Sequence, residues 1–319
     1  MSDAVARLKA QLPEHPSVDE LAPLADDYTG LRILAVHAHP DDESSKGSAS
    51  AAAYTDRGAR YMVATMTGGE RGDILNEEIK HSPRAHRDLP GMRRSEMAAA
   101  AKAIGIEHRW MGFVDSGLPE GDPMPPLPFG CFGVQPLERA AAPLVRLVRE
   151  YRPHVMISYD EIGGYPHPDH IMSHKVAVEA YEKAGDPEAY VGEGQPWAPL
   201  KLYYDRAFNP ERLVAGHEFL MAQSVFSGWV ENLVDQVSTE GIRHESTTRI
   251  PSSAYFDRRD QAMLAHASQI DPNGAFFAIP TEDVKKVWPW EDYTLIASRV
   301  PVDLPECCLA DGLDYKAAG

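Results

Sequence analysis

The sequence predicts an α/β fold: a Rossmann-like, mostly parallel sheet flanked by helices, with a metal site at the carboxyl ends of its strands. Three observations support this prediction. Short apolar runs alternate with segments of helical periodicity. Strand, helix and strand in that order imply a right-handed parallel unit. Two of the apolar runs are followed directly by histidines and carboxylates, at the place where open α/β sheets bind their ligands.

The order of these patterns predicts the elements along the chain. Residues 1–29 are polar and interrupted by prolines, so we expect an N-terminal arm that packs on the domain or frays. Residues 30–319 are expected to form a single α/β domain. Its expected strands cover 31–36, 61–65, 108–113, 154–159, 200–206 and 247–250. Its expected helices cover 48–56, 93–103, 134–151, a segment running on from 171, 212–222, 230–237 and 257–268, with loops at 74–92 and 123–128 and a C-terminal wrap from 288.

Composition and charge exclude several classes of function. The 319 residues include 31 Lys and Arg against 48 Asp and Glu, a formal charge of -17, which argues against nucleic acid or an anionic membrane as partner. No apolar stretch approaches the roughly 20 residues of a membrane span, and the first 30 residues lack the apolar core of a secretion signal. We therefore expect a cytoplasmic protein. Its three cysteines are too few and too poorly spaced for a disulfide framework or a thiolate zinc site.

The first candidate site follows the first expected strand, where residues 37–44 read HAHPDDES. Adjacent carboxylates near the end of a buried strand repel each other and lose hydration, so a cation or hydrogen bonds must offset the cost. A divalent metal is the simplest offset. His39 and Asp42 can then act as ligands and leave Asp41 facing the open coordination position. The same segment would also suit a helix N-cap at Asp42 or Ser44, with histidines on the surface.

The second candidate site follows the strand expected at 154–159, where residues 160–170 read DEIGGYPHPDH. His167 and His170 are three residues apart with Asp169 between them, which gives one metal ligand and a charged or hydrogen-bonding partner. A lone pair of this kind is more often a surface feature. Two such clusters at the ends of parallel strands together offer the His, Asp and His ligands of an open catalytic zinc site.

Three further segments carry polar residues whose role the sequence leaves open. The glycine-rich segment 67–73 reads as a tight turn, from which Arg71 could face the cleft. Asp115 lies just past a strand end, where an aspartate also commonly stabilises a turn. His266 follows a predicted helix, and we expect a solvated helix end there.

The two metal-binding segments, AHPDDE at 38–43 and HPDH at 167–170, resemble the LmbE or PIG-L family of zinc-dependent N-deacetylases. Longer strings resemble its mycothiol S-conjugate amidase branch: TGGERGDILN at 67–76, GFVDSGLP at 112–119, GGYPHPDH at 163–170 and HASQIDPN at 266–273. The resemblance spans about 31–300. It implies an LmbE-like catalytic domain with one Zn(II) per chain. Two histidines and one carboxylate also suit Fe(II).

The resemblance also implies a role for each candidate residue. The metal ligands would be His39, Asp42 and His170. Asp41 would be the general base for the attacking water. His167, oriented by Asp169, would stabilise the oxyanion and help protonate the leaving amine, and the Tyr165 hydroxyl would also contact the oxyanion. The contacts to a sugar-inositol substrate would map to Lys46, Arg93 and Asp115.

The function implied by this resemblance is metal-dependent hydrolysis of the amide of mycothiol S-conjugates, small-molecule thiol conjugates. The products would be a mercapturic acid and glucosaminyl-inositol, in thiol-dependent detoxification. The thiol-bound half is expected near the loops at 74–92 and 123–128. Two alternatives stay open: an N-acetylglucosaminyl-inositol deacetylase of mycothiol biosynthesis, and a catalytically silent sugar-binding protein. The oligomeric state is not predicted.

Overall fold

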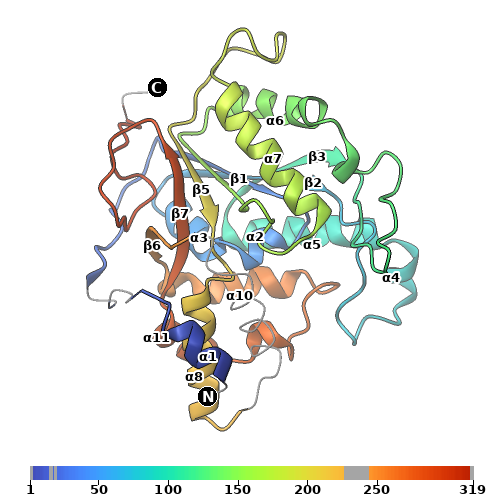
Figure 1. Ribbon diagram of the computed structural model, residues 1–319, viewed down its shortest axis with the longest axis vertical. Helices are drawn as coiled ribbons and strands as arrows, with labels where there is room; N and C mark the ends of the chain where they lie inside the picture. The colour runs from blue at the N-terminus through green and yellow to red at the C-terminus, as the bar shows by residue number, and fades with distance from the viewer. Residues whose placement is uncertain (1–2, 14–16, 18–19, 226–243, 317–319) are drawn as a thin grey trace.

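A seven-stranded sheet organises the protein (Figure 1). The computed structural model describes residues 3–13, 17, 20–225 and 244–316. The strands are ordered β3-β2-β1-β4-β5-β7-β6. The first five in this order are parallel, and β7 runs antiparallel to both of its neighbours. Their bounds are β1 Arg32–His37, β2 Arg60–Thr67, β3 Glu107–Phe113, β4 Val155–Ser158, β5 Lys201–Asp205, β6 Thr248–Pro251 and β7 Trp290–Ser298.

Helices cover both faces of the sheet, because side chains of a strand point alternately to its two faces. In β1, Ile33 and Ala35 pack in one core cluster, while Leu34 and Val36 pack in another. The first cluster lies beneath α3, α5 and α10, and the second beneath α6 and α7 (Figure 1). These helices span Ser48–Thr55 (α3), Leu89–Ile104 (α5), Phe256–Ala265 (α10), Leu137–Tyr151 (α6) and Pro168–Lys183 (α7).

Shorter elements complete the fold. The helix α1 packs on α8 through Val5, Leu8 and partners that include Val214 and Leu220. The described part of the N-terminal segment thus packs on the domain, and its division from the domain stays a prediction. None of the described helices has the length and apolar character needed to cross a bilayer. The remaining helices of the described residues are α1 Asp3–Lys9, α2 Asp42–Ser45, α4 Pro83–Arg87, α8 Pro210–Ala222 and α11 Thr281–Val287, with 3-10 turns at Phe132–Val134, Ser253–Tyr255 and Ala275–Phe277.

The structure confirms the predicted fold class and corrects four elements. The expected loop at 74–92 contains α4, and α5 begins at Leu89 rather than at Arg93. The helix α7 begins at Pro168, whose fixed φ suits a first helical position, rather than at 171. The region from 288 is an internal strand of the sheet, β7, rather than a C-terminal wrap. The helix expected at 230–237 lies outside the described residues.

The strand order places the candidate residues at one edge of the sheet. Successive strands run outward from β1 through β2 to β3, and the chain then returns to β4 on the other side of β1. The crevice at such a reversal, beyond the carboxyl ends of the strands, is where open α/β sheets bind ligands. Strands β1, β3 and β4 all end at this edge, so the two histidine clusters and Asp115, which follow these strands, meet there.

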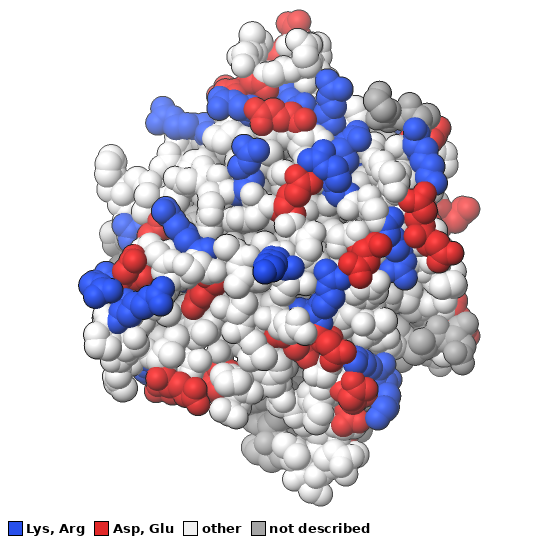
Figure 2. Space-filling model, turned by 180° about the vertical axis from the view of Figure 1, so that it is seen from behind, with Lys and Arg blue, Asp and Glu red and all other residues white. Residues whose placement is uncertain are grey.

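The face of the molecule seen in Figure 2 bears positive and negative side chains in alternation. Among the described residues visible there, no extended surface is basic alone. This face therefore lacks the continuous basic surface that binds a nucleic acid backbone, in line with the formal charge of -17 of the whole chain.

Candidate metal centre and active site

Three side chains bring their donor atoms together at the ends of β1 and β4. His39 Nδ1 lies 3.3 Å from His170 Nε2 and 3.7 Å from Asp42 Oδ2, and the last two atoms are 3.5 Å apart. Ligand atoms about 2.1 Å from a tetrahedral zinc ion lie roughly 3.4 Å from one another. The spacing of the three donors therefore fits one ion between them. All three side chains are buried.

The second nitrogen of each imidazole is held by a neighbour, as is usual around protein metal sites. His170 Nδ1 lies 2.9 Å from the carbonyl oxygen of Gly163, and His39 Nε2 lies 3.3 Å from Asp169 Oδ2. Both contacts place a proton on the outer nitrogen. The inner nitrogens, His39 Nδ1 and His170 Nε2, then face each other with their lone pairs, an arrangement that a cation between them would stabilise.

The electrostatic field at this position also favours a cation. Burial would lower the pKa of His39, but the carboxylates of Asp115, Asp169 and Asp42 outweigh it and raise that pKa to about 10. Burial lowers the pKa of His170 well below its ordinary value, so this ring is a neutral donor. A divalent ion would take the place of the proton on His39 Nδ1, since both neutralise the same carboxylates.

Asp42 is fixed by three hydrogen bonds. Its Oδ2 accepts from the backbone N–H of His39 at 2.9 Å and from the Tyr159 hydroxyl at 2.8 Å, and its Oδ1 accepts from Lys46 Nζ at 2.5 Å. Burial would raise the pKa of Asp42, but the Lys46 ammonium and the two imidazoles hold it well below the ordinary value. Asp42 lies inside α2, so it is not the N-cap of this helix. Lys46 contacts a proposed ligand, and a further contact to substrate stays a prediction.

A second group of donors surrounds the outer nitrogen of His39. It comprises His39, Asp115, His167 and Asp169. The two carboxylates already accept backbone hydrogen bonds, since Asp169 Oδ2 accepts from the N–H of Ser116 at 2.8 Å, and Asp115 accepts from the N–H groups of Arg71 at 2.9 Å and Gly117 at 2.7 Å. These bonds suit carboxylates that orient a ligand from outside. The group of His39, Asp42 and His170 is therefore the candidate that fits a metal ion better.

Asp41 has the geometry of a base beside the metal centre. Its side chain is 24% exposed, whereas that of Asp42 is 4% exposed. Burial raises the pKa of Asp41, the Arg93 guanidinium opposes this shift, and the neighbouring Asp42 carboxylate adds to it. A carboxylate with a raised pKa accepts a proton from water more readily. Of the two adjacent aspartates, Asp41 is thus the more exposed and the one whose pKa is raised.

The backbone of Asp41 is strained and is held in place by a buried ion pair. Its φ of 124° is uncommon for a residue with a side chain. The Asp41 N–H donates to Glu43 Oε2 at 2.9 Å, and Glu43 Oε1 lies 2.6 Å from His266 Nε2. His266 is fully buried, so the expectation of a solvated helix end was wrong. Sequence reasoning assigned no role to Glu43, although it directly follows the two aspartates.

Arg93 bonds to the turn that carries Asp41. One guanidinium nitrogen donates to the carbonyl oxygen of Pro40 at 2.6 Å and to Asp41 Oδ2 at 3.0 Å, and the other donates to the carbonyl oxygen of Gly69 at 3.0 Å. Gly69 has a φ of 64°, and an added Cβ would lie 2.1 Å from the guanidinium. The glycine-rich segment is thus a tight turn that makes room for Arg93.

His167 is positioned by a backbone contact rather than by the Asp169 carboxylate. Its Nδ1 accepts from the backbone N–H of Asp169 at 3.1 Å, so a neutral ring carries its proton on Nε2. The Asp169 carboxylate instead accepts from Ser116 Oγ and lies near His39. Tyr165 lies beside His167, with ring centroids 6.0 Å apart, and burial raises its pKa, so its hydroxyl keeps its proton at neutral pH.

The contact between Gly163 and His170 gives a direct test of the metal centre. An alanine Cβ at Gly163 would lie 2.4 Å from the Cβ of His170, and Gly163 also has a φ of 79°. We expect Gly163→Ala to displace His170 and weaken metal binding by about 10- to 100-fold, as for loss of an outer-shell partner. Metal affinity can be measured by competition with a chelating dye.

Gly164→Ala is the matched control for this variant. Gly164 has a φ of 74°, so alanine suffers similar backbone strain, but its added Cβ would meet nothing within 4 Å. Its metal affinity should stay close to that of the wild type. If the two variants lost metal equally, backbone strain rather than the contact with His170 would be the cause.

Comparison with known proteins shows which family the chain resembles. A family model described as GlcNAc-PI de-N-acetylase, PIG-L, matches residues 34–181. The chain is 47% identical over 289 residues to a protein of Streptomyces coelicolor named mycothiol S-conjugate amidase, covering 90% of this chain and 99% of that protein.

One further relative agrees with this result, and a solved structure shares the fold. A protein of Streptomyces avermitilis named 1D-myo-inositol 2-acetamido-2-deoxy-alpha-D-glucopyranoside deacetylase is 37% identical over 281 residues, covering 85% of this chain and 93% of that protein. Among solved structures, an N,N'-diacetylchitobiose deacetylase from Pyrococcus horikoshii shares the fold with a TM-score of 0.56 and 13% identity, covering 83% of each chain.

Proposed function

Since the chain belongs to the PIG-L family of de-N-acetylases, and is a hydrolase, we propose that it cleaves the amide bond of mycothiol S-conjugates. Water adds to the carbonyl carbon, the C–N bond breaks, and the products are an N-acetylcysteine S-conjugate and glucosaminyl-inositol. The likeness to the Streptomyces coelicolor amidase over nearly its whole length carries the proposal. The reaction would serve thiol-dependent detoxification in the cytoplasm.

His39, Asp42 and His170 would hold one Zn(II), with Fe(II) as the alternative that the same donors suit. When bound, such an ion polarises the amide carbonyl and makes water a usable nucleophile near neutral pH. Asp41 then accepts the proton that the attacking water releases. Its raised pKa and its reach into the open space support that role.

The other side chains act on the carbonyl oxygen and the leaving group. His167 presents its Nε2–H as a donor to the developing oxyanion, and the Tyr165 hydroxyl is a second donor. The proton that Asp41 takes from the attacking water is finally transferred to the leaving nitrogen. Either Asp41 or His167 can deliver a proton there. Asp169 acts on His167 through its backbone N–H.

The contacts of Lys46, Arg93 and Asp115 with the substrate are also part of this proposal. Arg93 and Asp115 lie on the β2 and β3 side of the metal centre, where they would meet the hydroxyl-rich glucosaminyl-inositol half. Lys46 lies at the other carboxylate oxygen of Asp42, Oδ1, and would contact the substrate from there. Arg93 and Asp115 already make several hydrogen bonds within the protein, so each would offer only its remaining donor or acceptor capacity.

Deacetylation of N-acetylglucosaminyl-inositol is the second candidate, because the relatives named as deacetylases are also similar over most of the chain. Both reactions hydrolyse an amide on the same amino sugar and need the same catalytic groups. A silent sugar-binding protein is disfavoured, since such a protein has no need of a strained, partly desolvated Asp41 beside three metal-binding side chains.

The inositol ring of the substrate gives a test of this proposal. If buried polar groups of the protein bind the glucosaminyl-inositol half of the substrate, removing part of that half leaves these protein groups unpaired. We expect kcat/KM for a bimane-type mycothiol conjugate to fall by at least about tenfold when inositol is removed. Steady-state kinetics with the conjugate and its des-inositol analogue check this, and equal efficiencies would overturn the proposed recognition of the sugar-inositol half.

A further inference from the structure

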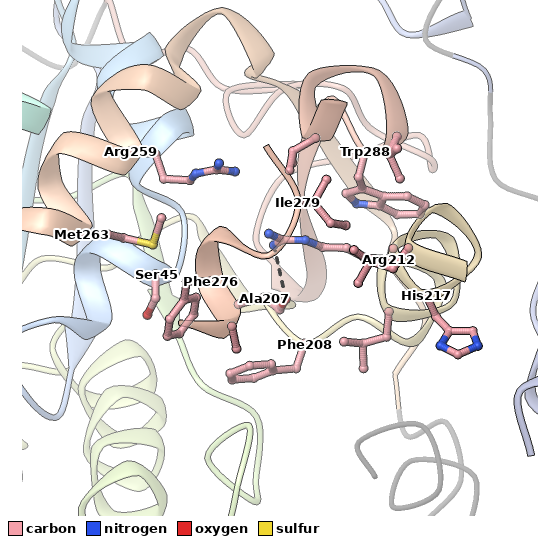
Figure 3. Close-up of a pocket in the computed structure, with 16 residues that line it drawn as sticks. Ser45, Ala207, Phe208, Arg212, His217, Arg259, Met263, Phe276, Ile279 and Trp288 are labelled. Atoms are coloured by element: carbon pink, nitrogen blue, oxygen red, sulfur yellow. Dashed lines mark hydrogen bonds between the residues drawn. The ribbon is translucent and has the colours of Figure 1, made fainter. Parts of the chain in front are cut away.

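A largely apolar cavity lies beyond the carboxyl end of β5 (Figure 3). Its volume is about 320 Å³, and its walls come from α8, α10, α11 and the segments that follow β5 and precede α11. Phe208, Leu213, Met263, Phe276 and Ile279 supply much of the apolar surface. A cavity of this size and polarity suits a small apolar ligand group.

The cavity adjoins the metal centre through α2. Ser45 lines the cavity and ends the helix that begins with the proposed ligand Asp42. Lys46 Nζ lies 2.5 Å from Asp42 Oδ1 and 5.9 Å from the ring centroid of Phe208, which also lines the cavity. A single side chain thus bridges the metal centre and the cavity wall.

The two sides of the metal centre differ in polarity. On one side lie three charged residues: Arg71 follows β2, Asp115 follows β3, and Arg93 reaches from α5 to the turns after β1 and β2. On the other side, Asp160 after β4 pairs with Arg206 after β5 at 3.3 Å, and the largely apolar cavity lies on this side as well. A substrate whose scissile amide lies at the metal centre extends its two halves along this edge of the sheet in opposite directions. The polar half matches the first side, and an apolar half matches the second.

We propose that this cavity binds the S-linked substituent of the conjugate, and that the substituent is an apolar aryl or alkyl group. This inference rests on the proposed function and names the half of the substrate that the function leaves open. It also moves that half away from the loops at 74–92 and 123–128. Apolar walls reject neighbouring apolar shapes only weakly, so the cavity accounts for a site that accepts many substituents.

The charges in the cavity wall add a preference. Arg212 and Arg259 both line it, and Figure 3 shows the Arg212 guanidinium within hydrogen-bonding distance of the Ala207 carbonyl oxygen, at 3.4 Å. Arginine is a cationic side chain, and the Arg259 guanidinium is paired with the Asp260 carboxylate at 2.8 Å. A cationic S-substituent should therefore bind less well than a neutral one of the same size.

Filling the cavity tests the proposal. Gly216 lines it, and a Cβ at this position would lie 3.3 Å from Ile279 Cδ1, so a side chain there grows toward the cavity. We expect Gly216→Phe to lower kcat/KM for an S-aryl conjugate by at least about tenfold and to change it less than about twofold for an S-methyl conjugate. Ala275→Phe, from another wall, should act in the same way.

Two control variants test whether the loss of kcat/KM for the S-aryl conjugate arises in the cavity. Ala222→Phe adds the same side chain at an exposed position of the same helix, and Met124→Glu changes the exposed 123–128 loop. Both variants should leave the ratio of kcat/KM for the S-aryl conjugate to kcat/KM for the S-methyl conjugate unchanged. An aryl-selective loss in Met124→Glu but not in Gly216→Phe, or losses in Gly216→Phe that are equal for both conjugates, would overturn the assignment of the cavity.

A measurement on the wild-type enzyme tests the proposal even if the variants do not fold. Product inhibition by N-acetylcysteine S-conjugates should strengthen from S-methyl to S-aryl by at least about tenfold, and equal inhibition would overturn the cavity assignment. The proposed function fails in a different way: the wild-type enzyme would then hydrolyse neither the S-methyl nor the S-aryl conjugate, and the cavity assignment would fall with it.

Discussion

Alanine in place of His39 or His170 should yield a folded protein with little metal and little activity. Each variant removes one of three donors whose atoms lie 3.3 to 3.7 Å apart. A metal ion that polarises a carbonyl stabilises the transition state by several kcal/mol, so we expect activity to fall on the order of 10³-fold or more. Metal analysis of the purified variants, beside circular dichroism, measures both parts of the prediction.

His174→Ala is the matched control for these variants. His174 lies one turn after His170 on α7 and is also buried, but its Nδ1 bonds the carbonyl oxygen of Tyr159 at 3.0 Å. It belongs to neither donor group found among the described residues. This variant should keep its metal. Full metal occupancy in His39→Ala or His170→Ala would show that the ion, if present, binds elsewhere.

Asp41→Asn should keep the metal and lose most turnover. Asparagine preserves the size of the side chain, tolerates positive φ better than most residues, and can still accept the hydrogen bond from Arg93. It cannot take up a proton. We therefore expect kcat to fall about 10²- to 10⁴-fold with KM little changed, as for loss of a positioned general base.

Metal content and kinetics of Asp41→Asn together separate the possible roles. Asp122→Asn, on an exposed loop, makes the same chemical change away from the centre and should be neutral. If Asp41→Asn lost its metal along with its activity, Asp41 would be a ligand or a folding element instead of a base.

The sequence was sufficient to predict which residues come together in the candidate site, because parallel strands end at the same edge of the sheet. Apolar runs before residues 37–44 and 160–170 identify two strands, and parallel strands end at the same edge of a sheet. The ligand types then limit what can bind there. Neighbours in sequence, such as Asp41 and Asp42, were also assigned different roles by their position on the turn.

Contacts between distant parts of the chain were not predictable from local patterns. His266 lies 223 residues from Glu43, and no periodicity links the two. The strand β7 was missed because its Glu291 and Asp292 are charged, and charged residues argue against a buried strand. In the fold, Glu291 accepts from the backbone N–H groups of Ala49 and Ser50, and Asp292 lies 3.3 Å from Arg249 Nε.

The proposed activity depends on which amide the enzyme prefers. A single zinc-loaded preparation should be assayed with a bimane-type mycothiol conjugate and with N-acetylglucosaminyl-inositol, and the products identified by mass spectrometry. We expect kcat/KM to be higher for the conjugate by at least about tenfold, because only the conjugate carries an apolar substituent for the cavity beside β5. A higher kcat/KM for N-acetylglucosaminyl-inositol would contradict the amidase function and identify the enzyme as a deacetylase.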